Sequence, residues 1–126
     1  EALRTFIAAG GQVVATGSSS GLGLRLGLPL ESHLRVAGKD GVRKALSPRE
    51  YYIPGSILDV AVETSLPVAR GVPHRLNVYF SDGRWDNAPV FDLPAGEAGI
   101  RPILRVDSDR PLRSGWAWGQ EHVKGR

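Results

Sequence analysis

The first 26 residues constrain the fold of this chain more than any other part of it. The apolar side chains over 2–7 recur at the spacing of one helix face, and Gly10-Gly11 predicts the end of that helix. The apolar run at Val13-Val14 then indicates a buried strand, and a serine-rich loop leads into a second helix over 20–26. Helix, strand, loop and helix in this order are typical of a layered α/β domain.

The remainder of the chain predicts mostly β structure. A long polar connection over 31–54 precedes the segment 57–63, where apolar and acidic residues alternate as in a half-buried strand. With 126 residues, the chain is long enough for one domain, and we expect a single domain over 1–126 with a strand-rich second half. Further strands are expected over 76–81, 89–93 and 101–106.

Composition excludes several classes of function. Lysine and arginine number 16 against 13 acidic residues, and these charges are scattered, so we expect no nucleic-acid partner. No apolar run is long enough to span a membrane. The absence of cysteine removes disulfides, thiolate metal ligands and cysteine nucleophiles. The three histidines are isolated in the sequence, so no metal site is expected within this chain, and no feature predicts a specific oligomer.

Residues 16–23 match the phosphate-loop pattern T-G-x-x-x-G-x-G of short-chain dehydrogenases. Such a loop needs a following helix long enough to aim its N–H groups at a pyrophosphate, whereas Pro29 ends this helix early. The family also uses a tyrosine and a lysine four residues apart, and neither Tyr51 nor Tyr52 has a lysine at that distance. We therefore reject the dehydrogenase interpretation and expect no nucleotide cofactor.

Gly17 to Gly21 also fits the G-x-S-x-G nucleophile elbow, with Ser19 as the nucleophile. A serine hydrolase would need an acid and then a histidine later in the chain. His122 is the histidine that this order offers, so the hypothesis predicts His122 beside Ser19 in space. The candidate acids are Asp59, Asp82 and Asp107.

A third hypothesis makes the serine-rich loop a binding site without catalysis. The backbone N–H groups of Ser18, Ser19 and Ser20 would grip an anion, which predicts an open pocket above residues 17–21. The tryptophans are further candidates for contact with a partner: Trp116 and Trp118 would share one side of an extended segment, and Trp85 lies in a polar turn.

Four segments, taken in order, resemble a known family. They are LRTFIAAGGQVVATGSSSGLGLRLGLPL, YYIPGSILDVAVETSLPVARGVP, VYFSDGRWDNAPVF and PLRSGWAWGQEHVKGR. Together they are similar to the C-terminal class I glutamine amidotransferase-like domain of bacterial zinc carboxypeptidases of the carboxypeptidase A type. The most specific pieces are P-G-S-I-L at 54–58 and S-G-W-x-W-G at 114–119.

The resemblance implies a flavodoxin-like α/β layer acting as a non-catalytic accessory domain. Active amidotransferases carry a cysteine at the turn that Gly17 to Ser20 fill here, so amidotransferase chemistry is not expected. Peptidase activity and its zinc would belong to an upstream catalytic domain, the expected intramolecular partner. The domain could pack against that partner, shape substrate access or bind cell-envelope material. The chain is then expected to be truncated at both ends, and its lack of cysteine is compatible with an exported or periplasmic parent protein.

Overall fold

A computed structural model describes residues 1–38, 40–81, 90–92 and 99–126. Two short α-helices, α1 (Ala2–Ala8) and α2 (Leu22–Leu26), lie in the N-terminal part, and three 3₁₀ helices, η1 (Gly17–Gly21), η2 (Pro67–Ala69) and η3 (Gln120–Val123), are spread along the chain. None of the helices in these ranges could cross a bilayer. The strands are β1 (Glu31–Ser32), β2 (Arg35–Ala37), β3 (Arg43–Ala45), β4 (Ser56–Val62), β5 (Arg75–Phe80), β6 (Phe91–Asp92), β7 (Leu104–Arg105) and β8 (Leu112–Ser114).

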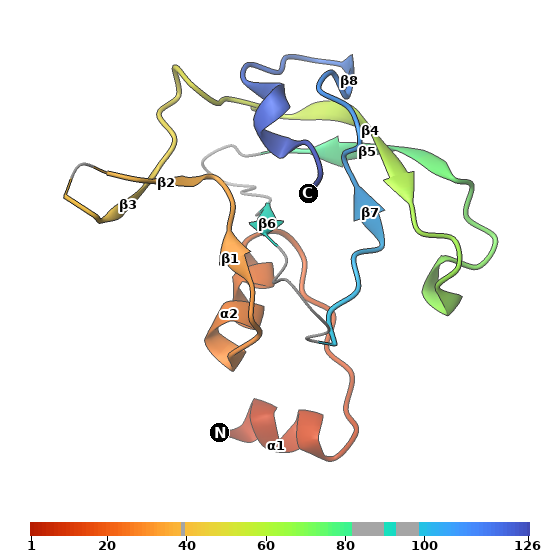
Figure 1. Cartoon of the computed structure of the whole chain (residues 1–126). Coiled ribbons are helices and arrows are strands. Elements are labelled where there is room, and N and C mark those ends of the chain that lie inside the picture. Colours follow the sequence, from red (N-terminus) through yellow and green to blue (C-terminus); the bar gives the residue numbers. More distant parts are fainter. Residues whose placement is uncertain (39, 82–89, 93–98) are drawn as a thin grey trace.

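An antiparallel sheet built around β4 is the largest sheet in the described ranges, and it lies in the upper part of Figure 1. β5 pairs with β4 along its length, with Leu58 opposite Val78 and Val60 opposite Leu76. β7 and β8 pair with opposite ends of β4, and because β5 occupies one edge of β4, both lie along the other. The strands predicted over 57–63 and 76–81 are thus confirmed as β4 and β5, each within one residue.

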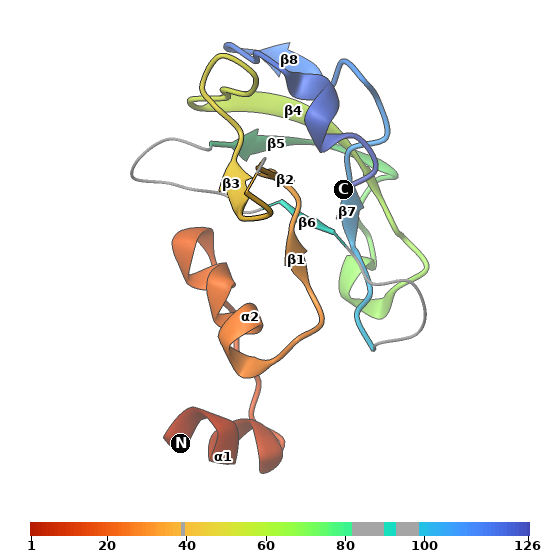
Figure 2. The same ribbon diagram turned by 60° about the vertical axis from the view of Figure 1, so that its left-hand side comes forward.

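The hydrophobic core covers one face of this sheet. The predicted alternation in β4 places Leu58, Val60 and Val62 on this inner face, where all three are buried. Val123 of η3 and the buried Tyr51 and Ile53 pack in the same region, so η3 and the segment before β4 help to close the core (Figure 2). The other core residues are Val90 and Val106.

The N-terminal segment differs from the expected helix–strand–loop–helix order. Both helices form, and α2 ends as predicted, at Gly27 in the left-handed conformation with φ +90°. The strand expected at Val13-Val14 is wrong: residues 11–16 form no strand, and Val14 is 89% exposed. An apolar run becomes a strand only where a neighbouring strand supplies backbone hydrogen bonds. None of the described strands pairs with residues 11–16.

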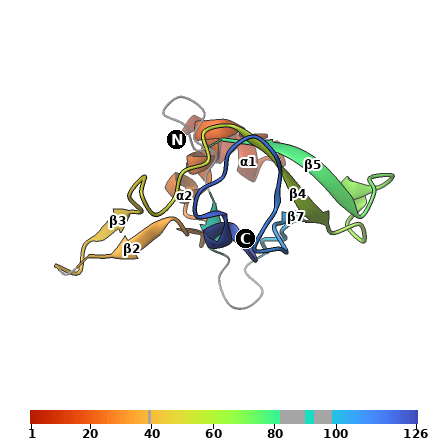
Figure 3. The same ribbon diagram turned by 90° about the horizontal axis from the view of Figure 1, so that it is seen from above.

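The remaining strands are short. The polar connection expected over 31–54 contains β1 and the hairpin of β2 with β3, which projects from the rest of the chain in Figure 3. The strand expected over 101–106 is limited to β7. Of the strand expected over 89–93, residues 91–92 form β6, which pairs with β1, and residues 89 and 93 lie outside the described ranges. The described strands pair only in antiparallel fashion, in a mixed α/β chain with few helices.

Candidate functional site

The serine-rich loop folds as a local helical turn at the surface. The N–H of Ser19 donates to the carbonyl oxygen of Thr16 at 3.1 Å, and the hydroxyl of Ser20 donates to the carbonyl oxygen of Gly17. Ser18 and Ser19 are exposed, and Ser20 is half-buried. Within the described ranges, no hydrogen bond joins these three serines to a histidine or a carboxylate.

The structure does not bring Ser19 and His122 together. His122 lies in η3, where its ring packs edge-on against Tyr51 with ring centroids 6.5 Å apart. Figures 1 and 2 show α2 and the turn before it well away from η3. Because no strand precedes the loop, the strand–turn–helix context of a nucleophile elbow is also missing.

The candidate acids lie in another part of the molecule or outside its described part. Asp82 and Trp85 belong to the ranges that the structure does not describe. Asp59 is only 7% exposed, although it points to the outer face of the sheet. Its carboxylate accepts hydrogen bonds from Arg75, whose Nη2 lies 2.9 Å from Oδ2, and from Arg113. Asp107 accepts from the other end of the same Arg75 guanidinium, at 2.8 Å.

These four charged side chains hold the sheet together. Arg75 lies on β5, Asp59 on β4 and Arg113 on β8, while Asp107 follows β7. Hydrogen bonds from Arg75, and then from Arg113, lower the pKa of Asp59 below its ordinary range, and the bonds from Arg75 do the same for the pKa of Asp107. Reciprocally, Asp107 and Asp59 raise the pKa of Arg75. Carboxylates held ionised in this way stabilise structure and are poor general acids or bases near neutral pH.

A second polar cluster joins distant parts of the chain at His33. Its Nδ1 lies 2.9 Å from Oδ1 of Asp92, and its Nε2 lies 2.6 Å from the carbonyl oxygen of His122. Arg126 completes the cluster, with Nε 2.5 Å from the same oxygen of Asp92. The cluster connects the segment after β1 with β6 and with the end of η3. Its charges are therefore engaged in holding these elements together.

Three exposed aromatic residues lie on two neighbouring segments, and we call them the aromatic surface: Tyr52, Trp116 and Trp118. They are 44%, 63% and 55% exposed, respectively. Tyr52 and Trp118 exchange both backbone hydrogen bonds, each 2.9 Å long, as an antiparallel pair. Ala117, between the two tryptophans, packs against the core. Alternation of exposed and buried residues is the pattern predicted for an extended segment.

Hydrogen bonds fix the position of the aromatic surface. The buried hydroxyl of Ser56 accepts from the N–H of Trp116 at 3.0 Å and donates to the carbonyl oxygen of the same residue at 2.6 Å. The indole N–H of Trp118 donates to the carbonyl oxygen of Arg49 at 2.5 Å, which restricts that ring. Exposed aromatic rings that need no rearrangement to meet a partner lose little conformational entropy on binding.

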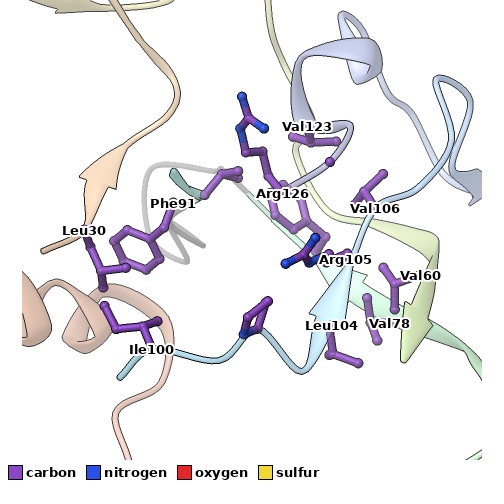
Figure 4. Close-up of a pocket in the computed structure, with 14 residues that line it drawn as sticks. Leu30, Val60, Val78, Phe91, Ile100, Leu104, Arg105, Val106, Val123 and Arg126 are labelled. Atoms are coloured by element: carbon purple, nitrogen blue, oxygen red, sulfur yellow. The ribbon is translucent and has the colours of Figure 1, made fainter. Parts of the chain in front are cut away.

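An apolar cavity of about 430 Å³ opens beside the inner face of the sheet. Apart from Gly125 and two arginines, every described residue of its lining has an apolar side chain. In Figure 4, Val60 and Val78 form one wall, and Leu30, Phe91 and Ile100 form the wall facing it. A second, more polar hollow of about 420 Å³ adjoins it and shares Arg105. Neither space is lined by residues 17–21, above which a pocket was expected.

The described part of the chain contains no group of three histidine, aspartate or glutamate side chains that could hold a metal ion. The spacing of Trp116 and Trp118 indicated a possible contact surface, but the place of Tyr52 beside Trp118 was not predicted. The apolar cavity was not predicted either, because its lining comes from segments far apart in sequence. No protein-family model matches this chain, and no curated protein and no solved structure matches it either.

Proposed function

We propose that this chain is a non-catalytic accessory domain of a zinc carboxypeptidase-like protein, and that it docks on the catalytic domain through the aromatic surface. The peptidase chemistry and its zinc reside in that other domain. The observation that carries this proposal is the exposure of Tyr52, Trp116 and Trp118 on a backbone held by Ser56. Tryptophan and tyrosine are enriched at the centres of protein interfaces, where they contribute most of the binding energy.

The resemblance of the four sequence segments supports the choice of parent protein. The S-G-W-x-W-G piece at 114–119, one of the two most specific parts of that resemblance, contains both tryptophans of the aromatic surface. On the same grounds, we propose that the domain is a divergent relative of the flavodoxin-like, amidotransferase-like layer. The two helices on either side of residues 9–16 support this relationship.

A binding measurement between this chain and the remainder of its parent protein tests the proposal. We expect isothermal titration calorimetry to detect association. The double variant W116A/W118A should weaken it by at least about thirtyfold, since such anchors contribute about 2 kcal/mol or more. Y79A is the matched control, because Tyr79 is an exposed aromatic residue of β5 outside the aromatic surface. An upstream sequence without a zinc peptidase domain, or equal association of both variants, would refute the proposal.

A further inference from the structure

The apolar cavity has the size and lining of a ligand site. Its volume of about 430 Å³ falls in the range of roughly 300–1,000 Å³ that is typical of small-molecule pockets. It is about three times the cavity of ~150 Å³ that holds benzene in another protein, so an eight-carbon chain can be accommodated. The walls are mostly aliphatic, as at Val60, Val78 and Leu104.

Arg105 brings a positive charge to this apolar space. Its side chain lines the cavity, and in Figure 4 its guanidinium is directed toward the centre. Among the described residues it has no hydrogen-bond or ion-pair partner. The acidic group whose electrostatic influence reaches it is Glu63, which is hydrogen-bonded by Ser65 through its N–H at 3.2 Å and its hydroxyl at 2.6 Å. Arg105 thus retains donors for a ligand.

The second arginine of the lining is already engaged. Arg126 contacts Asp92 and His33, and in Figure 4 its guanidinium turns away from the cavity. Arg105 is therefore the charged donor available to a ligand within the described lining. A guanidinium pairs best with a planar carboxylate, which it can bind through two parallel hydrogen bonds.

We propose that this cavity binds a medium-chain aliphatic carboxylate, with the chain between the walls formed by Val60 and Ile100 and the carboxylate on Arg105. The lining favours an acyl chain over the apolar C-terminus of a peptide. A peptide would bring amide groups into the cavity, and apart from the two arginines the described lining offers no polar side chain to pair with them. The site is separate from the aromatic surface and does not depend on the proposed function.

Titration of the isotopically labelled chain with octanoate, followed by methyl NMR, tests the proposal. We expect shift changes centred on Val60, Val78 and Leu104. Octanoate should bind about tenfold more tightly than octanamide, which has the same chain without the charge. Shortening the chain to hexanoate removes two methylenes and should weaken binding by about fifteenfold, because each methylene contributes about fourfold.

The variant R105Q assigns the charged contact. It should bind octanoate and octanamide equally, and its unchanged affinity for octanamide would show that the cavity is intact. R110Q is the matched control, because Arg110 is an exposed arginine outside the cavity lining and should leave octanoate binding unchanged. Equal octanoate affinity in R105Q and wild type would overturn the proposal. The absence of any shift change with millimolar octanoate would also overturn it, as would a chain that binds acetyl-phenylalanine but not octanoate.

Discussion

Replacing Ser56 by alanine removes the hydroxyl that holds the backbone of Trp116. Ser56 is 3% exposed, and its Oγ makes two hydrogen bonds to Trp116, one to the N–H and one to the carbonyl oxygen. The substitution removes only the hydroxyl oxygen and adds no atoms. Its effect on stability is therefore a measure of these two hydrogen bonds.

The expected cost follows from the groups left without partners. A buried backbone donor or acceptor without a hydrogen bond costs about 1–3 kcal/mol. The N–H and the carbonyl oxygen of Trp116 are only partly shielded, because this residue is exposed, so water reduces the cost. We therefore expect S56A to lower the free energy of unfolding by about 2 kcal/mol. For a chain of this length, that corresponds to a fall in Tm of about 8 °C.

Urea denaturation followed by far-ultraviolet circular dichroism measures this change. S114A is the matched control, since Ser114 is an exposed serine of β8 whose hydroxyl makes no hydrogen bond to the described residues. Its stability should stay within about 0.5 kcal/mol of the wild type. If S56A were as stable as S114A, the two hydrogen bonds would contribute nothing, and the aromatic surface would not be held in place as we argue.

Two further predictions concern stability. Arg75 and Arg113 lower the pKa of Asp59, so the stabilisation from this carboxylate is complete above about pH 5 and is lost as the pH falls through the folded-state pKa. The urea stability of D59N should therefore decline less between about pH 5 and pH 2 than that of the wild type. Parallel declines would contradict this. G119A should destabilise more than G71A in the same assay. Both positions have positive φ, costing roughly 1–2 kcal/mol with a side chain, but only at Gly119 would the new Cβ lie 2.0 Å from a backbone carbonyl oxygen; equal losses would show that the backbone yields without cost.

The candidate site was predictable only where it depends on residues close in sequence. The spacing of Trp116 and Trp118 indicated two rings on one side, and both are exposed. The ionic contacts of Asp59 could not be derived from its place in the alternating segment. A carboxylate on the outer face of a strand is normally solvated, and this one is buried because Arg75 and Arg113 arrive from β5 and β8 to cover it.

The serine-rich loop shows that a local sequence motif does not by itself predict a catalytic site. Gly17 to Gly21 has the composition of an elbow, and its helical turn forms through local hydrogen bonds. An elbow also needs a strand behind it and a histidine in front of Ser19. Both requirements depend on parts of the chain that meet only in the folded state, and here they are not met among the described residues.

The amino-acid sequence by itself determined the short helices at 2–8 and 22–26, their glycine ends, and the two long strands β4 and β5, because helical spacing, left-handed glycine and alternation are properties of neighbouring residues. Tertiary structure alone decided that Val13-Val14 stays outside the sheet, that Asp59 is buried with arginines, and that Arg105 faces an apolar cavity. Strand pairing, charge burial and cavities all require atoms from distant segments, and a linear pattern carries no information on which of those segments will meet.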